Sequence, residues 1–249
     1  MLNLEKMLSS SVHLGHQVKK WNPKMAPFIY GERNKLHIID ILQTLLCLQK
    51  ACNFLYKSSK ENKIFLFVST KKQFSSLVES EIKNSNSFFV TKRWLGGMLT
   101  NWFTIKNCIN NLKILSKEEE LTNSFLGLTK KECSILKKRK SNVNLFIYFI
   151  YKYCCFFLFL RIKKISIKLE KFLSGIKDMN RLPDIVIIIG QNREMNAVRE
   201  CLKLNISTVT IVDTNCDPTL TEFFIPANDD SVSSVTLILN ELSKSINLI

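Results

Sequence analysis

The sequence predicts an α/β fold: a parallel sheet with helices on both faces, into which a pair of long helices is inserted. The runs at 63–70 and 184–190 are apolar enough to be strands buried on both faces. These and weaker strand patterns alternate with segments of helical spacing, as in a parallel sheet whose strands are joined by helices. Two long basic segments of helical spacing, 99–117 and 130–178, interrupt the alternation, and we expect them to pair as an antiparallel hairpin.

The elements before the interruption follow from the hydrophobic spacing, in chain order. The apolar residues within 1–10 have helical spacing, which predicts a short amphipathic helix. Residues 13–35 are basic and contain two prolines, so they predict a loop. The remaining predictions are a short strand at 35–40, a helix at 41–59, the strand at 63–70, a helix at 72–83, a short strand at 87–90, and a helix from about Leu99 to Lys117.

After the interruption, the buried strand at 184–190 restores the α/β pattern. It is followed by a helix at 193–204, a strand at 207–213, a short strand at 223–227 and a helix at 231–246. We therefore expect a globular α/β domain with a basic N-terminal loop from 1–98 and 180–249. The helical hairpin would comprise 99–179 and carry an unusual apolar insertion at about 141–165.

The apolar segment within the hairpin allows three interpretations. Its longest run, Leu145–Leu160, has 16 residues, is interrupted by Lys152 and is flanked by basic residues. A transmembrane helix needs about 20 apolar residues, so the run is marginal for that role. The segment is a membrane-associated stretch, an insertion in the hairpin, or an intervening sequence translated into the protein.

The charge of the chain indicates an anionic partner. The formal net charge is +15 and the sequence pI is about 9.5. All of the basic excess lies in the first 180 residues, whereas 181–249 carry nine acidic and five basic side chains. A protein with one face on phosphates would show this asymmetry, so we expect nucleic acid first and an anionic membrane second.

The sequence offers little for metal binding or nucleophilic catalysis. His13 and His16 are three residues apart, but a zinc site would need further ligands from His37, Asp213 or Asp217. The eight cysteines contain no CxxC pair, which predicts reduced thiols. No GxSxG motif is present. We therefore expect no catalytic residue and no metal.

A nucleotide cofactor is also not expected, although the strand pattern is that of nucleotide-binding folds. The chain contains neither GxGxxG nor GxxxxGK[ST]. Ligands of open α/β sheets bind at the carboxyl ends of strands. The residues there are Gly190, Gln191, Asn192, Asp213 and Asp217, and we interpret these aspartates, together with Asp229 and Asp230, as mainly structural.

Two stretches combine basic, amide and aromatic side chains, and they carry the functional prediction. Cations neutralise phosphates, arginine and asparagine donate to phosphate and sugar, and aromatic rings stack on bases. Together with the charge asymmetry, this combination predicts RNA contact. The N-terminal basic cluster consists of Lys19, Lys20, Trp21, Asn22, Lys24, Arg33, Asn34 and Lys35; the second basic cluster consists of Lys92, Arg93 and Asn101.

Five blocks of the sequence resemble the bacterial-type ribosomal protein S2 family, uS2, of the small subunit. They are "VHLGHQVKKWNPKMAPFIYGERNKLHIIDILQT", "KRWLGGMLTNWFTIK", "SGIKDMNRLPDIVIIIG", "TVTIVDTNCDP" and "IPANDDSVSSVTLIL". The resemblance covers about 1–140 and 165–246 in order. It departs from the family at 141–165, where the family runs one continuous hairpin helix.

The resemblance implies a Rossmann-like α/β domain with an inserted coiled-coil hairpin, and no catalysis, cofactor or small-molecule substrate. It implies docking on small-subunit rRNA between the head and the body of the subunit, beside neighbouring ribosomal proteins. It also implies a possible S1-like mRNA-binding partner. The residues of the two basic clusters would be the rRNA contacts.

The compartment follows from indirect signs. The bacterial-type motifs, a composition typical of AT-rich DNA and a first motif close to the N-terminus indicate an organelle-encoded protein. We expect the plastid ribosome, with the mitochondrion second and a reduced bacterium third. The alternative functions are a nucleotide-binding α/β enzyme and a membrane-associated basic protein held through 145–160.

Overall fold

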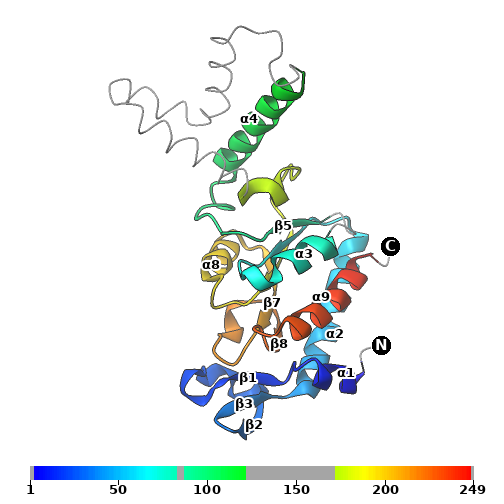
Figure 1. The fold of residues 1–249 in the computed structure, drawn as a ribbon, viewed down its shortest axis with the longest axis vertical. Helices are drawn as coiled ribbons and strands as arrows, with labels where there is room; N and C mark the ends of the chain where they lie inside the picture. The colour runs from blue at the N-terminus through cyan, green and yellow to red at the C-terminus, as the bar shows by residue number, and fades with distance from the viewer. Residues whose placement is uncertain (1–2, 83–86, 122–171, 248–249) are drawn as a thin grey trace, which may run out of the picture. The chain divides into compact units, whose positions relative to one another are not determined.

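The computed structural model describes residues 3–82, 87–121 and 172–247 (Figure 1). The chain divides into two compact units. Unit 1 comprises Met1–Thr100 and Arg181–Ile249, and unit 2 comprises Asn101–Asn180. Unit 1 therefore joins both ends of the sequence, with unit 2 inserted between them.

Unit 1 is built on a five-stranded parallel sheet, which confirms the predicted α/β class (Figure 1). The order across the sheet is β5-β4-β6-β7-β8, and all neighbouring strands are parallel. Every residue of β4 and β6 is buried, as their continuous apolar sequences predict. The strands are β4 (Phe65–Val68), β5 (Phe88–Val90), β6 (Ile185–Ile189), β7 (Ser207–Val212) and β8 (Phe223–Pro226).

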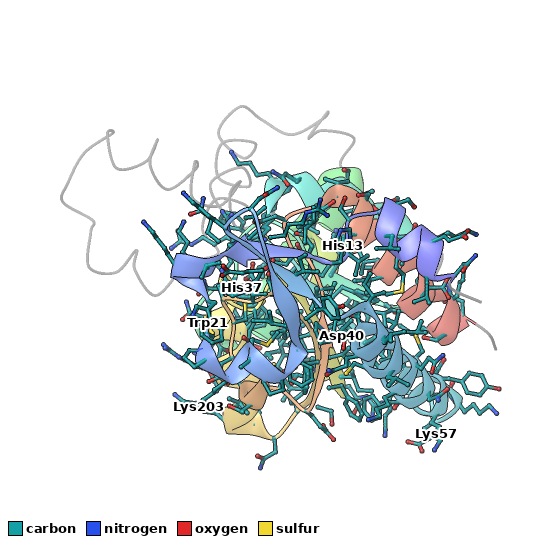
Figure 2. The ribbon with its side chains drawn as sticks, turned by 90° about the horizontal axis from the view of Figure 1, so that it is seen from below. His13, Trp21, His37, Asp40, Lys57 and Lys203 are labelled. Carbon is teal, nitrogen blue, oxygen red and sulfur yellow. The ribbon has the colours of Figure 1, made fainter. Side chains whose placement is uncertain are left out.

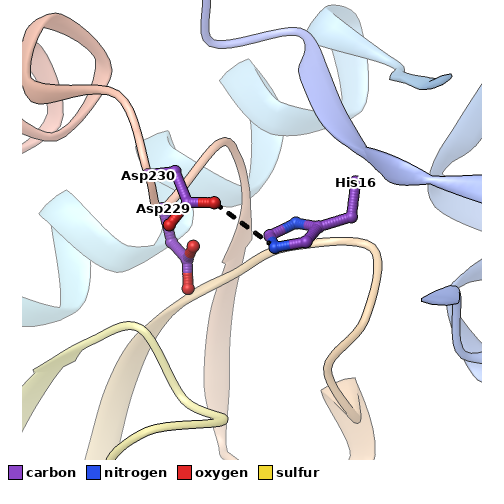
Figure 3. A group of neighbouring side chains, drawn as sticks. All are labelled: His16, Asp229 and Asp230. Atoms are coloured by element: carbon purple, nitrogen blue, oxygen red, sulfur yellow. Dashed lines mark ion pairs between the residues drawn. The ribbon is translucent and has the colours of Figure 1, made fainter.

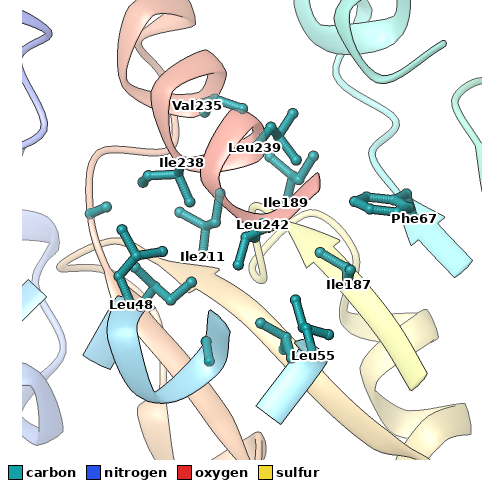
Figure 4. Packing of buried hydrophobic residues seen from close by; sticks show 14 of the residues in the cluster. Leu48, Leu55, Phe67, Ile187, Ile189, Ile211, Val235, Ile238, Leu239 and Leu242 are labelled. Atoms are coloured by element: carbon teal, nitrogen blue, oxygen red, sulfur yellow. The ribbon is translucent and has the colours of Figure 1, made fainter. Parts of the chain in front are cut away.

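Helices cover both faces of this sheet. Figure 1 shows α2 (Ile41–Lys60), α3 (Ser75–Ile82) and α9 (Val232–Asn247) on one side, and α8 (Met195–Leu204) on the other. The predicted helices at these positions are thereby confirmed, with ends that shift by a few residues. The core between the sheet and the first three helices includes Leu48, Leu55, Phe67, Ile187, Ile189, Ile211, Ile238 and Leu242 (Figure 4).

The predicted loop at 13–35 is wrong in part, because it contains two strands. After the short helix α1 (Leu4–Ser9), β1 (Leu14–Gln17) and β2 (Ile29–Arg33) pair antiparallel with β3 (Leu36–Ile39). We call these three strands the N-terminal sheet. Both unpredicted strands are only partly buried, so they lack the apolar alternation that marks a strand. Two short helical turns, η1 (Val18–Lys20) and η2 (Pro23–Phe28), connect β1 to β2.

Helix α4 (Trp102–Leu121) begins three residues later than predicted and ends four residues later. The start shifts because backbone N–H groups just before it donate to the side chain of Glu200. Within unit 2, Lys113 Nζ of α4 lies 3.0 Å from Asp178 Oδ1.

The rest of the predicted hairpin falls mainly on 122–171, outside the described residues. The insertion at 141–165 and its apolar run at 145–160 lie there too. Within the described ranges, no helix has both the length and the apolarity needed to cross a membrane.

Candidate nucleic-acid interface

The N-terminal basic cluster lies on the N-terminal sheet and the turn beside it. Lys19 and Lys20 belong to η1, Arg33 ends β2, and Asn34 and Lys35 form the turn into β3. All five side chains are exposed. Their cations form no ion pair with any residue that the structure describes. These charges are therefore available to an external anion.

The turn that carries Asn34 and Lys35 has an unusual backbone. Arg33 pairs with Leu36, so the hairpin loop has two residues. Both have positive φ, 53° and 64°, as in a type I′ turn. Asparagine tolerates this conformation, whereas lysine pays a steric cost in a position that favours glycine. A lysine at this position is therefore unfavourable for folding.

The other three residues of the N-terminal basic cluster, Trp21, Asn22 and Lys24, make contacts within the protein. The ring of Trp21 is 39% exposed and lies 5.4 Å from the ring of His37, centroid to centroid (Figure 2). The Asn22 side chain accepts from the backbone N–H of Lys24 at 3.0 Å. The Lys24 ammonium lies 2.6 Å from Asp217 Oδ2. Asn22 and Lys24 thus shape the segment, and Trp21 offers a partly free ring.

A tight contact joins the N-terminal sheet to the segment after β7. The backbone N–H of His16 donates to Thr214 Oγ1 at 2.9 Å, and that of Asn22 donates to the Thr214 carbonyl at 2.8 Å. Gly15 faces the same threonine so closely that a Cβ would lie 2.6 Å from Thr214 Cγ2. Only glycine allows this approach.

The second basic cluster follows the edge strand β5. Lys92 and Arg93 are exposed and form no ion pair within the described chain. Trp94 is buried, so it belongs to the core. Asn101 precedes α4 and accepts from the hydroxyl of Thr104 at 2.7 Å. Lys92 and Arg93 follow β5, whereas Asn22 of the N-terminal basic cluster bonds to the segment after β7, and β4 and β6 lie between these two strands.

Acidic residues fill the sheet position where a nucleotide would bind. The chain order reverses between β4 and β6, and open α/β sheets bind ligands at the carboxyl ends of strands at such a point. There, Lys71 Nζ lies 2.8 Å from Asp229 Oδ1 and 2.9 Å from Asp230 Oδ1. A Cβ on Gly190 would lie 3.1 Å from Asp229 Oδ2. Carboxylates this close to the strand end would repel a phosphate, so the crevice does not suit a nucleotide.

His16 reaches the same acidic group from the N-terminal sheet (Figure 3). Its Nδ1 lies 2.9 Å from Asp213 Oδ2 and its Nε2 lies 3.3 Å from Asp230 Oδ2. The ligand atoms of His16, Asp229 and Asp230 lie within 4.8 Å of one another, which is a geometry that could hold a cation. The Lys71 ammonium already supplies positive charge to both aspartates. The histidine pair considered from the sequence, His13 with His16, is not the group that the structure brings together.

We expect replacement of His16 by Asn to destabilise unit 1 most at acidic pH. The hydrogen bond to Asp213 and the nearby negative charges outweigh burial and raise the pKa of His16 above 6.5. The stabilisation is therefore complete below the unfolded pKa and is lost as the pH rises through the folded pKa. Asn keeps a donor but cannot be protonated, so the loss should be about 1–2 kcal/mol below about pH 6.5 and smaller above it.

Urea denaturation of both proteins across this pH range measures the difference in unfolding free energy. A difference that grows toward alkaline pH would contradict the assigned role of His16.

Buried thiols in this region are not reactive. Burial raises the pKa of Cys201 to about 12, and it does the same for Cys216. A thiol with so high a pKa is a poor nucleophile at neutral pH.

Comparison with known proteins decides the family. A family model described as ribosomal protein S2 matches residues 7–152 and 159–248. The small ribosomal subunit protein uS2c of Euglena gracilis is 56% identical over 247 residues, which are 99% of this chain and 91% of that protein. The chain belongs to the ribosomal protein S2 family. The uS2c proteins of Mesostigma viride and Guillardia theta are 47% and 44% identical, each over 98% of this chain and over 96% and 93% of their own lengths.

Membership of the S2 family gives the chain its role. It is a structural protein of the small ribosomal subunit and not an enzyme. These uS2c relatives are the plastid version, so the chain acts in the plastid ribosome, as expected. The family implies assembly with rRNA and ribosomal proteins. The family model also matches most of the segment at 141–165 that we interpreted as an insertion, and it omits only residues 153–158.

Several residues that build this region were not among the predicted site residues. Lys71, Glu194 and Glu200 hold loops at the carboxyl ends of the strands through hydrogen bonds to distant residues. Their partners lie about a hundred or more positions away, so no local motif marks them.

Proposed function

We propose that the chain binds small-subunit rRNA through the exposed cations of its two basic clusters. The observation that carries this is that six cations gather in these two stretches, are exposed and have no carboxylate partner among the described residues. Lys24 of the N-terminal basic cluster is the exception, since it is paired with Asp217. An unpaired surface cation loses no intramolecular contact when it binds a phosphate and releases counterions. The proposed phosphate contacts are Lys19, Lys20, Arg33, Lys35, Lys92 and Arg93.

The remaining cluster residues have other parts in this proposal. Trp21 offers a half-free ring for stacking on a base or ribose. Asn34 adds a polar group at the hairpin tip. Asn22 and Lys24 mainly fix the segment beside η1, through a backbone hydrogen bond and an ion pair with Asp217. Asn101 stays in the proposal as a polar contact just before α4.

An S1-like mRNA-binding protein is the further partner that we propose from the family resemblance. Copurification from plastid small subunits with and without this chain tests it. Equal S1-like protein in both preparations would argue against the partnership.

The double variant Lys19→Ala/Lys20→Ala should weaken incorporation into small subunits without unfolding unit 1. Each lost phosphate contact lowers the slope of log affinity against log salt by about one, so the pair should lower it by about two. Filter binding to small subunits depleted of this chain, over a salt series, measures both quantities.

The matched control is Lys57→Ala/Lys203→Ala, which removes the same charge from exposed positions outside both clusters (Figure 2). Equal losses for the two double variants would show that only net charge matters, and the proposed contacts would then be wrong.

Lys35→Gly should raise stability and lower rRNA affinity at the same time. Glycine relieves the left-handed backbone at this position, which is worth about 1 kcal/mol or slightly more. It also removes one proposed phosphate contact. Thermal denaturation and the same binding assay measure the two effects, with Asn205→Gly as a control at another positive-φ residue. Unchanged binding by Lys35→Gly would remove Lys35 from the interface.

A further inference from the structure

The loop after Arg93 is organised around one buried carboxylate from α8. Glu200, 8% exposed, accepts at Oε1 from Trp94 Nε1 at 3.0 Å and from the Gly97 N–H at 2.8 Å. Its Oε2 accepts from the Leu99 N–H at 3.0 Å and from the Thr100 N–H at 3.3 Å. A single side chain therefore accepts hydrogen bonds from four residues between Trp94 and Thr100.

The carboxylate is charged in this setting. Burial alone would raise the pKa of Glu200, but the hydrogen bonds from Trp94 and the loop backbone hold it below the ordinary value. Charged acceptors make hydrogen bonds about twice as strong as neutral ones. Glu200 therefore fixes a loop that has neither helix nor strand hydrogen bonds of its own over 94–100.

This anchor begins one residue after the exposed cations Lys92 and Arg93. On their other side, the hydroxyl of Thr91 donates to Glu79 Oε1 at 2.8 Å. The two cations thus lie on a short exposed stretch between two anchored residues, Thr91 and Trp94. A backbone held in this way loses little entropy when its cations bind phosphate.

We propose that Glu200 is a positioning residue for rRNA binding, and that it acts by holding Lys92 and Arg93 in their binding geometry. The inference rests on the proposed function of the second basic cluster. Glu200 itself touches no RNA, because its carboxylate is buried and fully used by the loop.

A double-mutant cycle on the full chain tests the coupling. Its members are the wild type, Glu200→Gln, Lys92→Ala/Arg93→Ala and the triple variant. Gln keeps the shape but loses the charge, and its amide N–H faces loop donors. Affinity for small subunits depleted of this chain is measured over a salt series, at a temperature where every variant is folded.

We expect Glu200→Gln to lower the affinity about tenfold, because two cations and their loop must be ordered on binding. It should also lower the slope of log affinity against log salt toward the slope of Lys92→Ala/Arg93→Ala. The triple variant should bind no more weakly than Lys92→Ala/Arg93→Ala. The control is Glu194→Gln, which changes another buried carboxylate that holds a loop, through the N–H and hydroxyl of Thr70. That variant should leave the salt slope unchanged.

The other outcomes overturn either the positioning role of Glu200 or the proposed RNA contacts of Lys92 and Arg93. Normal binding by Glu200→Gln, or losses that add in the triple variant, would overturn the positioning role alone. Normal binding by Lys92→Ala/Arg93→Ala would overturn the proposed contacts of this cluster, and the inference with them. If Glu200→Gln does not fold, Trp94→Phe removes one donor to Glu200 while keeping a ring, and it should lower the salt slope in the same direction; an unchanged slope would overturn the positioning role.

Discussion

Gly15→Ala is expected to separate the N-terminal sheet from the parallel sheet and to abolish most of the rRNA affinity that the N-terminal basic cluster provides. The added Cβ would lie 2.6 Å from Thr214 Cγ2 and 3.2 Å from the backbone oxygen of His37. Thr214 is 0% exposed, so its methyl group cannot turn out into solvent. Overpacking of this kind costs about 1–3 kcal/mol, here concentrated at one contact.

The rescue variant is Gly15→Ala/Thr214→Ser. Serine removes the Cγ2 at 2.6 Å but keeps the Oγ, which accepts from the His16 N–H and would lie 3.0 Å from the added Cβ. We therefore expect a partial rescue. Limited proteolysis of the N-terminal sheet and binding to depleted small subunits measure the effect. If serine at 214 restored neither protection nor binding, the contact between Gly15 and Thr214 would not be what docks the sheet.

Phe67→Ala should cause the largest loss of stability. Phe67 is 2% exposed in β4, next to the central strand, and belongs to the core beneath α2, α3 and α9 (Figure 4). Removing a buried phenyl ring costs about 3–5 kcal/mol, from lost burial and the cavity left behind. Since a domain of this kind is stable by about 5–15 kcal/mol, much of the folded population would be lost on mild heating.

Phe103→Ala is the matched control, because the Phe103 ring is 76% exposed. Its effect on stability should stay within about 0.5 kcal/mol. Denaturant unfolding followed by Trp fluorescence compares the two variants. Similar denaturation midpoints for the two variants would contradict the assignment of Phe67 to the core beneath α2, α3 and α9.

The parallel sheet could be predicted because its strands carry their own signal. Residues such as Ile187 and Phe67 stand in continuous apolar runs that only a doubly covered sheet buries. The helices between them follow from apolar spacing, and α2 also begins at a recognisable cap, Asp40, whose side chain accepts from the Leu42 N–H.

The N-terminal sheet and the loop anchors could not be predicted in the same way. β1 and β2 are short and half exposed, and the turn between β2 and β3 uses Asn34-Lys35 where a glycine would have marked a hairpin. Glu200 looks like any polar residue of α8 in the sequence, and only the fold shows that it binds 94–100. The candidate site was predictable as charge and composition, but the groups that hold it were not.

Ultraviolet crosslinking of intact plastid small subunits, followed by peptide mass spectrometry, tests the central claim most directly. Nucleotide adducts should concentrate on peptides that contain Lys19 and Lys20, Arg33 and Lys35, or Lys92 and Arg93, and should be absent from those containing Lys57 or Lys203. Adducts confined to the acidic segment 181–249, with none on the two basic clusters, would contradict the account.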